Sequence, residues 1–166
     1  MLGPYLRIWC VALLCFTLIA CKEEKQTGLT EANIRQAIAE MNDASAKFDA
    51  TAICAMLDET AVISLKQVKF SGPESSTMRK DEYCRFVSVG MKALSQAGAT
   101  YQTSTVVDEI KIAPDGLTGE VKYASTDHVV AGGKTLRSSF AGTSSLIWRN
   151  GRVMVTSVRG VVQFSQ

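Results

Sequence analysis

The sequence predicts an α+β fold, in which a strongly curved, mostly antiparallel sheet carries N-terminal helices on its concave face. Two observations lead to this class. Residues 30–98 place apolar side chains at spacings of three and four, as amphipathic helices do. Residues 101–164 instead hold four long segments rich in Val, Thr, Ile and aromatic residues, which favour strands. Only short turn sequences separate these four segments, so consecutive strands must be antiparallel neighbours.

The composition excludes several classes of function. The chain has 166 residues, of which 46% are hydrophobic and 20% charged, and this suits a single globular domain. Its net charge of +2 and the lack of a basic stripe with interleaved aromatic residues give no reason to expect a nucleic-acid partner. The chain has a single histidine, no Gly-rich phosphate loop and no Gly-x-Ser-x-Gly motif. We therefore expect no metal site and no cofactor.

Residues 1–20 are predicted to be a secretory signal. Ile8 to Ala20 is an apolar run of 13 residues that follows the basic residue Arg7. It is too short for a transmembrane helix, which needs about 20 residues. The run ends in Leu18-Ile19-Ala20-Cys21, which resembles the lipobox of bacterial lipoproteins, where the cysteine is acylated and becomes the mature N-terminus. The alternative is a buried N-terminal strand or helix with an incidental cysteine, but the charged residues 22–25 argue against it.

Lipidation of Cys21 would fix the place of the protein in the cell. The resemblance implies a lipid-anchored protein of the bacterial cell envelope, with a tether over residues 21–29 and a domain over residues 30–166. Lys22, and not an aspartate, follows the cysteine, and in a Gram-negative cell this resembles the class sorted to the outer membrane. The domain would then face the periplasm. The membrane, reached through the N-terminal lipid, is the first partner that we expect.

Three helices are predicted before the long strands. Thr30 is the expected N-cap of the first helix, and Asp49 can cap a second, short one. The third begins at Lys80 and ends near Gly98, a favourable C-cap residue. Between the second and third helices, residues 61–70 are expected to form a first strand and residues 71–76 a loop.

Cys54 and Cys84 are the only cysteines outside the N-terminal segment. They fall on the second and third predicted helices, and an exported chain would lie in an oxidising compartment. We expect a disulfide between them. Two buried thiols are one alternative. A cysteine nucleophile is another, although neither residue has a positively charged environment in the sequence.

The four C-terminal segments form the expected sheet. Their lengths exceed the usual 3–10 residues, so flat strands would be longer than a domain of this size. Mid-strand glycines at positions 119, 142 and 160 indicate where the strands can bend. The segments and the turns between them are 101–112, Pro114-Asp115-Gly116, 117–130, Gly132-Gly133, 134–149, Asn150-Gly151 and 152–164.

The order of helix, helix, strand, helix and long bent meander resembles an NTF2-like domain of the SnoaL-like, cystatin-like α+β cone type. The resemblance covers nearly all of residues 30–164. It rests on residues 34–65, on the third helix at 80–97, and on the ending Arg149-Asn150-Gly151-Arg152-Val153. Val153 replaces the tryptophan that many members carry there. The resemblance implies a cone-shaped domain whose sheet and helices enclose a pocket.

Period-two alternation predicts which strand residues line that pocket. It places Val121, Tyr123, Ser125, Asp127 and Val129 on the concave side, and it groups Val153, Val155, Ser157, Arg159 and Val161 on one face of the last strand. The predicted pocket residues are Tyr83, Tyr123, Asp127, Trp148 and Arg159.

An Asp127–Arg159 ion pair is expected inside the cone, where it would serve either chemistry or structure. His128 follows Asp127 directly, so it should point to the opposite face and lie on the surface.

The expected function is the binding of a small apolar or amphipathic ligand, or of a protein partner, and a homodimer through the convex sheet face is one version of the latter. The resemblance also allows an isomerase, dehydratase or hydrolase that uses Asp127 with Arg159. Similar enzymes of the ketosteroid isomerase type use a carboxylate base with a tyrosine in the oxyanion hole, and epoxide hydrolases use an Asp-Arg-Asp set. No set in this sequence aligns with either. We assign no catalytic residue and favour binding over catalysis.

Overall fold

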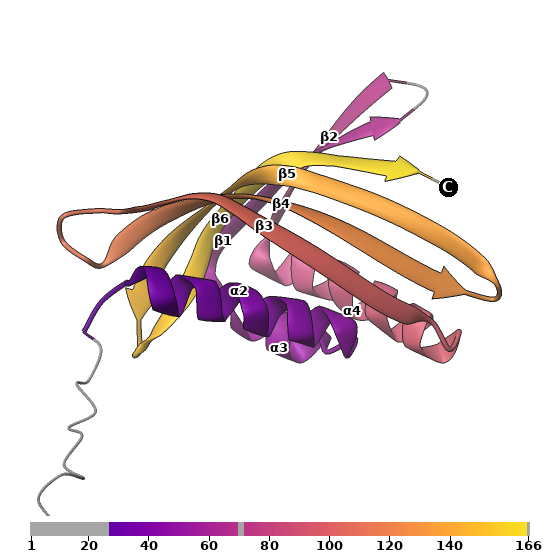
Figure 1. Ribbon diagram of the computed structural model, residues 1–166, viewed down its shortest axis with the longest axis horizontal. Helices are drawn as coiled ribbons and strands as arrows, with labels where there is room; N and C mark the ends of the chain where they lie inside the picture. Colours follow the sequence, from indigo (N-terminus) through magenta and orange to yellow (C-terminus); the bar gives the residue numbers. More distant parts are fainter. Residues whose placement is uncertain (1–26, 70–71, 166) are drawn as a thin grey trace, which may run out of the picture.

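The computed structural model of the protein describes residues 27–69 and 72–165. The predicted signal, the lipidation site Cys21 and most of the tether lie outside the described residues. Within them, no helix is long and apolar enough to cross a membrane. The described residues form three helices and six strands. Figure 1 shows these helices beneath a strongly curved sheet, and this α+β architecture confirms the predicted fold class. The elements are α2 (Glu31–Ala46), α3 (Ala50–Ala55), β1 (Leu57–Lys69), β2 (Gly72–Arg79), α4 (Lys80–Gln96), β3 (Thr100–Ile112), β4 (Thr118–Ala131), β5 (Lys134–Arg149) and β6 (Arg152–Ser165).

The sheet has six strands in the order β2-β1-β6-β5-β4-β3. Strands β3 to β6 form the predicted antiparallel meander, and β1 joins β6 in a parallel pair. The two-residue turns fix the register, because Ala131 pairs with Lys134 and Arg149 pairs with Arg152.

The loop predicted at residues 71–76 is wrong. From Gly72 onwards these residues belong to β2, which pairs antiparallel with β1 at one edge of the sheet. Turn-forming residues are tolerated in this position, because Pro73 pairs with Val68 on an edge strand that has no further neighbour.

The sheet bends where two glycines meet. Gly142 of β5 pairs with Gly160 of β6, and the ring of Phe140 lies over both. A Cβ atom at Gly142 would lie 2.6 Å from Cζ of Phe140, and one at Gly160 would lie 2.5 Å from it. The missing side chains therefore leave room for this ring on the inner face, and the strands curve around it.

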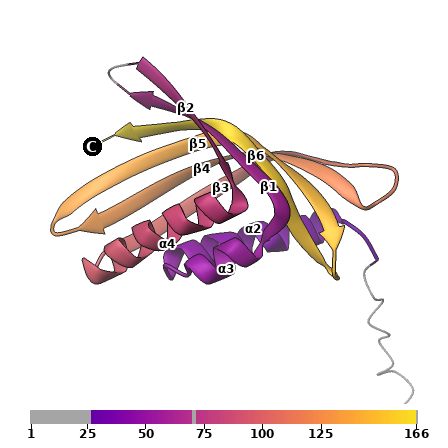
Figure 2. The ribbon, with the colours of Figure 1, turned by 180° about the vertical axis from the view of Figure 1, so that it is seen from behind.

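The helices cover the concave face of the sheet (Figures 1 and 2). Thr30 caps α2 as predicted, and its side chain accepts a hydrogen bond from the backbone N–H of Asn33. Leu29, which we assigned to the tether, is buried in the core, and its N–H donates to the carbonyl of Gly116 at 2.7 Å. The folded domain thus begins slightly earlier than predicted, because the apolar Leu29 side chain packs against Gly119.

The predicted disulfide joins Cys54 of α3 to Cys84 of α4, with Cα atoms 5.7 Å apart. Ile53 and Val87, which neighbour the bridge on the two helices, are buried together with Ala44 of α2. The three helices therefore form one layer that is held by a small core of its own and by the bridge.

An ion pair between a buried aspartate and an exposed arginine links strand β1 to strand β5. Asp58 is almost inaccessible to solvent, and its carboxylate accepts a hydrogen bond from the Arg149 guanidinium at 2.7 Å. The hydroxyl of Thr60 donates to the same carboxylate at 2.7 Å, and the Thr60 N–H donates at 3.0 Å. These hydrogen bonds, followed by the charges of Arg149 and Lys80, lower the pKa of Asp58.

Candidate functional site

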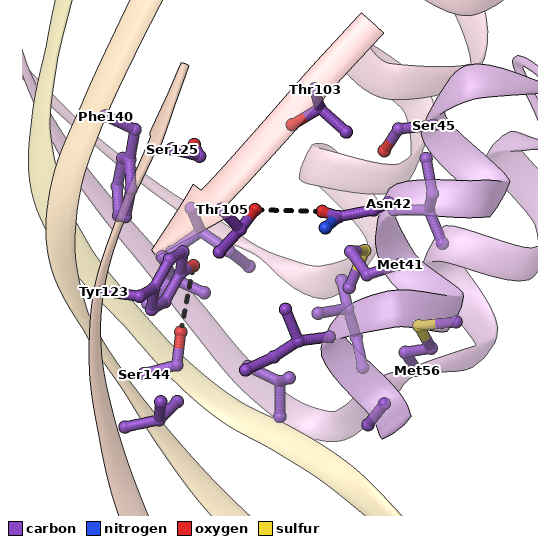
Figure 3. A pocket seen from close by; sticks show the side chains of 18 of the residues that line it. Met41, Asn42, Ser45, Met56, Thr103, Thr105, Tyr123, Ser125, Phe140 and Ser144 are labelled. Carbon is purple, nitrogen blue, oxygen red and sulfur yellow. Dashed lines mark hydrogen bonds between the residues drawn. The ribbon is translucent and has the colours of Figure 1, made fainter. Parts of the chain in front are cut away.

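The sheet and the helices enclose a cavity of about 330 Å³, which Figure 3 shows from close by. All three helices and strands β1, β3, β4, β5 and β6 contribute to its lining. Most of this lining is apolar. Its larger apolar side chains include Ile34, Met41, Ile63, Leu65, Val87, Met91, Val121, Leu146, Val158 and Val162.

The two ends of the cavity differ in burial. At one end Ile34, Val121 and Leu146 keep at most 5% of their surface exposed, and they form a core cluster with Leu29 and Val153. We call this cluster the closed end. Towards the Gly132-Gly133 turn the lining residues are only half-buried, as for Tyr101, Asp127 and Val162. Beyond them Leu136 and Phe164 are 42% and 48% exposed. We call this region the wide end.

A polar group surrounds Asp127 at the wide end. The hydroxyl of Ser138, which pairs directly with Asp127 across β4 and β5, donates a hydrogen bond to its carboxylate at 3.1 Å. The phenol of Tyr101 on β3 donates to the same carboxylate. Tyr83 reaches the site from α4. Asp127 is therefore held by neutral donors from two neighbouring strands.

Burial raises the pKa of all three phenols that line the cavity. Burial, followed by the charges of Tyr123 and Asp127, raises the pKa of Tyr83 to about 12. Burial also raises the pKa of Tyr101, and the charge of Asp127 and a hydrogen bond to it add to the effect. The pKa of Tyr123 is raised mainly by burial. All three hydroxyls are thus protonated at neutral pH and can donate hydrogen bonds.

Further polar contacts, drawn in Figure 3, lie nearer the closed end, where Ser144 pairs with Val121. The hydroxyls of Tyr123 and Ser144 are 3.3 Å apart, and the Thr105 hydroxyl donates to the side-chain oxygen of Asn42 at 3.1 Å. The ring of Tyr123 packs against that of Phe140, with centroids 5.2 Å apart. These groups satisfy one another, so the deeper part of the cavity presents mainly apolar surface.

The structure brings together three of the five predicted pocket residues. Tyr83, Tyr123 and Asp127 line the cavity. Trp148 does not line it but packs against the core of the closed end. Arg159 is exposed and does not line it either.

The predicted Asp127–Arg159 pair is therefore wrong, and a bulge in β6 is the reason. Leu146 pairs with Val155 whereas Ser145 pairs with Ser157, so Thr156 is an extra residue. It reverses the alternation in the part of β6 that follows. Val153 and Val155, which precede the bulge, line the cavity as predicted. Beyond the bulge, Val158 and Val162 line it in place of Ser157, Arg159 and Val161.

Other lining residues were not singled out from the sequence. Among them are Tyr101, Ser138 and Phe140. Of these, Ser138 could have been predicted from the hairpin turn. Because Gly132-Gly133 is a two-residue turn, Ala131 must pair with Lys134, and counting back places Asp127 opposite Ser138. His128 does not line the cavity, and its neighbour Asp127 does, in line with strand alternation.

The described residues contain no group of three or more His, Cys, Asp or Glu side chains that could hold a metal ion. Of the described residues that line the cavity, Asp127 is the only one with a charged side chain. The arrangement can bind an apolar molecule and orient a polar group on it near Asp127.

No protein-family model matches the chain, and no curated protein matches its sequence. Solved structures do match. A conserved protein from Planctomyces limnophilus superposes with a TM-score of 0.66 at 16% identity, covering 81% of this chain and 97% of that one. An NTF2-like protein with a cystatin-like fold from Novosphingobium aromaticivorans has a TM-score of 0.55 at 13% identity, covering 97% and 90%.

The fold is NTF2-like. A ketosteroid isomerase-like protein from Erwinia carotovora atroseptica is also similar, with a TM-score of 0.53 at 14% identity over 81% of this chain and 95% of that one. At these identities the likeness establishes the NTF2-like cone alone, and the chemistry has to be argued from the cavity of this chain.

Proposed function

We propose that the protein binds a small amphipathic molecule inside its NTF2-like cone. One observation carries the proposal, namely a mainly apolar cavity of about 330 Å³ that holds a cluster of hydroxyls and one carboxylate at its wide end. Ligand sites of proteins have volumes of about 300–1,000 Å³ and combine apolar walls with a few placed polar groups.

The apolar and the polar residues of the lining contact different parts of the proposed ligand. The apolar walls formed by residues such as Leu65, Val158 and Val162 favour an apolar body, at about 0.8 kcal/mol for each buried methylene. Tyr83, Tyr101 and Asp127 orient a polar group, because an unpaired polar atom would be costly in this surrounding.

Adjacent positions on β4 offer a matched test. Ser125 lines the cavity, whereas Thr126 lies on the opposite face of the strand. We expect the wild-type protein and the Thr126→Phe variant to bind the fluorescent apolar probe N-phenyl-1-naphthylamine. The Ser125→Phe variant, whose ring fills the cavity, should bind it at least about tenfold more weakly. Equal binding by all three proteins would place the probe outside the cone and contradict the proposal.

Native mass spectrometry of protein purified from its own host supplies an independent test. A bound molecule should be present in the wild-type protein and in Thr126→Phe, and it should be missing from Ser125→Phe. Spectra of the wild-type protein that are repeatedly free of ligand would count against a tightly held natural ligand.

We further propose that the cone is a lipoprotein domain of the bacterial cell envelope, anchored through Cys21. The lipobox-like Leu18-Ile19-Ala20-Cys21 supports this, and so does the short separation from Cys21 to the buried Leu29. Eight peptide steps span at most about 28 Å, which would keep the cone close to the membrane. In a Gram-negative host we expect the outer membrane, with the cone in the periplasm.

Cells that are fed an alkyne fatty acid can test the anchor. We expect label on the wild-type protein and on the control variant Cys15→Ser, and none on Cys21→Ser. Labelling of Cys21→Ser, or its retention in the membrane fraction, would contradict this anchor.

A homodimer through the convex sheet face is a second binding role. It is supported by exposed apolar side chains on the outer side of the strands, such as Val62 and Val106, which are 38% and 61% exposed. Sedimentation velocity of the protein should then detect a dimer that Val106→Asp dissociates. A monomer at high concentration would contradict it.

Catalysis is the competing function, and it would use Asp127 as a base with a phenol such as Tyr83 rather than with Arg159. A carboxylate beside a protonated phenol can move a proton and stabilise a developing oxyanion. A panel of β,γ-unsaturated cyclic ketones tests this, followed by ultraviolet absorbance. Isomerisation by the wild type that is lost in Asp127→Asn would favour catalysis, and no turnover by the wild type would favour binding alone.

A further inference from the structure

The charge of Asp127 has no cationic counterpart in the cavity. No lysine, arginine or histidine is among the described residues that line the cavity, and none of the ion pairs between described residues includes Asp127. Arg159, the expected partner, is exposed on the other face of β6 because of the bulge at Thr156. The carboxylate faces the cavity as an uncompensated negative charge.

The hydrogen bonds of Asp127 bring no positive charge to the carboxylate. Ser138 donates at 3.1 Å, and Tyr101 donates from the neighbouring strand. Both donors are neutral hydroxyls, so they hold the carboxylate in position without compensating its charge. Such an arrangement leaves a fixed negative potential in an apolar, partly enclosed space, where a charge is only weakly screened.

Aromatic rings surround the same charge. Tyr83 from α4, Tyr101 from β3 and Tyr123 from β4 line the same cavity as the carboxylate of Asp127. Phe140 extends this group through its contact with Tyr123. The faces of aromatic rings carry negative potential and attract organic cations, most strongly when the cation is shielded from water.

We propose that the ligand of this cone is an organic ammonium compound, whose cationic nitrogen lies beside Asp127 among Tyr83, Tyr101 and Tyr123 and whose apolar body extends towards the closed end. This inference rests on the proposed ligand-binding function and names the chemical class of the ligand. The same features disfavour a fatty acid or another carboxylate, because the lining offers it a like charge and no cationic group.

Three ligands with the same alkyl chain separate charge from apolar contact. They are decyltrimethylammonium, 1-decanol and decanoate, each used below its micelle concentration to displace N-phenyl-1-naphthylamine from the full-length protein. We expect decyltrimethylammonium to bind at least about tenfold more tightly than decanol, from the combined attraction of the carboxylate and the rings, and decanoate to bind most weakly.

Variants of β4 attribute this preference to Asp127. Asp127→Asn keeps the shape of the side chain and an acceptor for Ser138 and Tyr101, so the fold should persist. It should reduce the affinity for decyltrimethylammonium to that for decanol and leave decanol within about twofold of the wild type. Glu120→Gln removes one negative charge from the exposed face of the same strand and should retain the preference.

Equal affinity of the wild type for decyltrimethylammonium and decanol would overturn the inference, and so would tighter binding of decanoate. A preference that survives in Asp127→Asn would overturn it as well. In each of these cases, displacement of the fluorescent probe by any of the ligands would still support the proposed binding function. If neither the probe nor any of the three ligands binds, the proposed function itself fails.

Discussion

The two ends of the cone are built from the same strands but use them differently. At the closed end β4, β5 and β6 contribute Val121, Leu146 and Val153 to a core that excludes solvent. At the wide end β4 and β5 contribute Asp127 and Ser138, which are half-buried and face the cavity. At the closed end the apolar side chains pack against one another, whereas at the wide end polar side chains face the cavity. Residues that stabilise the fold and residues that can bind a ligand therefore occupy different parts of the same strand.

The largest expected loss of stability distinguishes two leucines of β5. Leu146→Ala removes a side chain from the closed end and should lower the free energy of unfolding by about 2–5 kcal/mol. Leu136→Ala makes the same change at the wide end, where the side chain is 42% exposed, and should cost less than about 1 kcal/mol. Denaturant unfolding followed by circular dichroism measures both. An equal decrease of the unfolding free energy in the two variants would show that the closed end and the wide end do not differ in packing.

The disulfide should contribute the next largest effect. Cys54 and Cys84 hold α3 to α4, whose Tyr83 forms part of the wide end. The double variant Cys54→Ala/Cys84→Ala should lose about 3 kcal/mol of stability by the chain-entropy estimate and should bind the fluorescent probe more weakly. Reductant should destabilise the wild type and leave the double variant unchanged. A reductant effect of equal size in both proteins would rule out the bridge as its cause.

The ion pair of Asp58 and Arg149 gives stability a pH dependence. Because the pKa of Asp58 is lowered in the folded state, its contribution is present above the pKa of the unfolded chain and is lost as the pH falls through the folded value. Asp58→Asn should lower the free energy of unfolding at neutral pH by about 2 kcal/mol, because the buried side chain loses its charge and with it the charge-assisted hydrogen bond from Arg149. The difference in unfolding free energy between the wild type and Asp58→Asn should become smaller at acidic pH.

Unfolding midpoints of the wild type and Asp58→Asn, measured across the acidic range, test that narrowing. The control variant Asp108→Asn changes an exposed aspartate on β3 and should follow the wild type. A gap between wild type and Asp58→Asn that is constant with pH would exclude titration of Asp58 as the cause.

The smallest expected effect concerns Tyr123. Tyr123→Phe removes the contact with the Ser144 hydroxyl and should cost less than about 1 kcal/mol. It keeps the ring, so its affinity for decyltrimethylammonium should stay within about twofold of the wild type, whereas Tyr123→Leu should lose several-fold. Probe displacement measures both variants. Equal affinities for Phe and Leu would show that the ring does not contact the cation.

The fold and part of the site follow from local patterns in the sequence. Alternation along β4 has no interruption at Tyr123 and Asp127, so it correctly placed both in the cavity. Helix spacing and the tight turns predicted the helices and the meander in the right order. The pairing of Cys54 with Cys84 could be predicted because no other cysteines lie outside the N-terminal segment.

The errors arise where a single residue or a neighbouring strand decides the outcome. The extra residue Thr156 reverses the faces of β6, and no local pattern in the sequence marks it, so Arg159 was placed on the wrong side. Residues 72–76 have the composition of a loop but gain hydrogen bonds from β1, and this tertiary contact overrides their weak strand propensity. Tyr101 reaches Asp127 only through the pairing of β3 with β4.

If the wide end is a binding site and the closed end is a core, a ligand should perturb only the wide end. Amide chemical shifts of the ¹⁵N-labelled protein, titrated with decyltrimethylammonium, measure this difference residue by residue. We expect the largest shifts at Tyr101, Asp127 and Ser138, together with small shifts at Trp148 beside the closed end. Shifts concentrated on the convex face of the sheet, at residues such as Val106, would contradict this expectation.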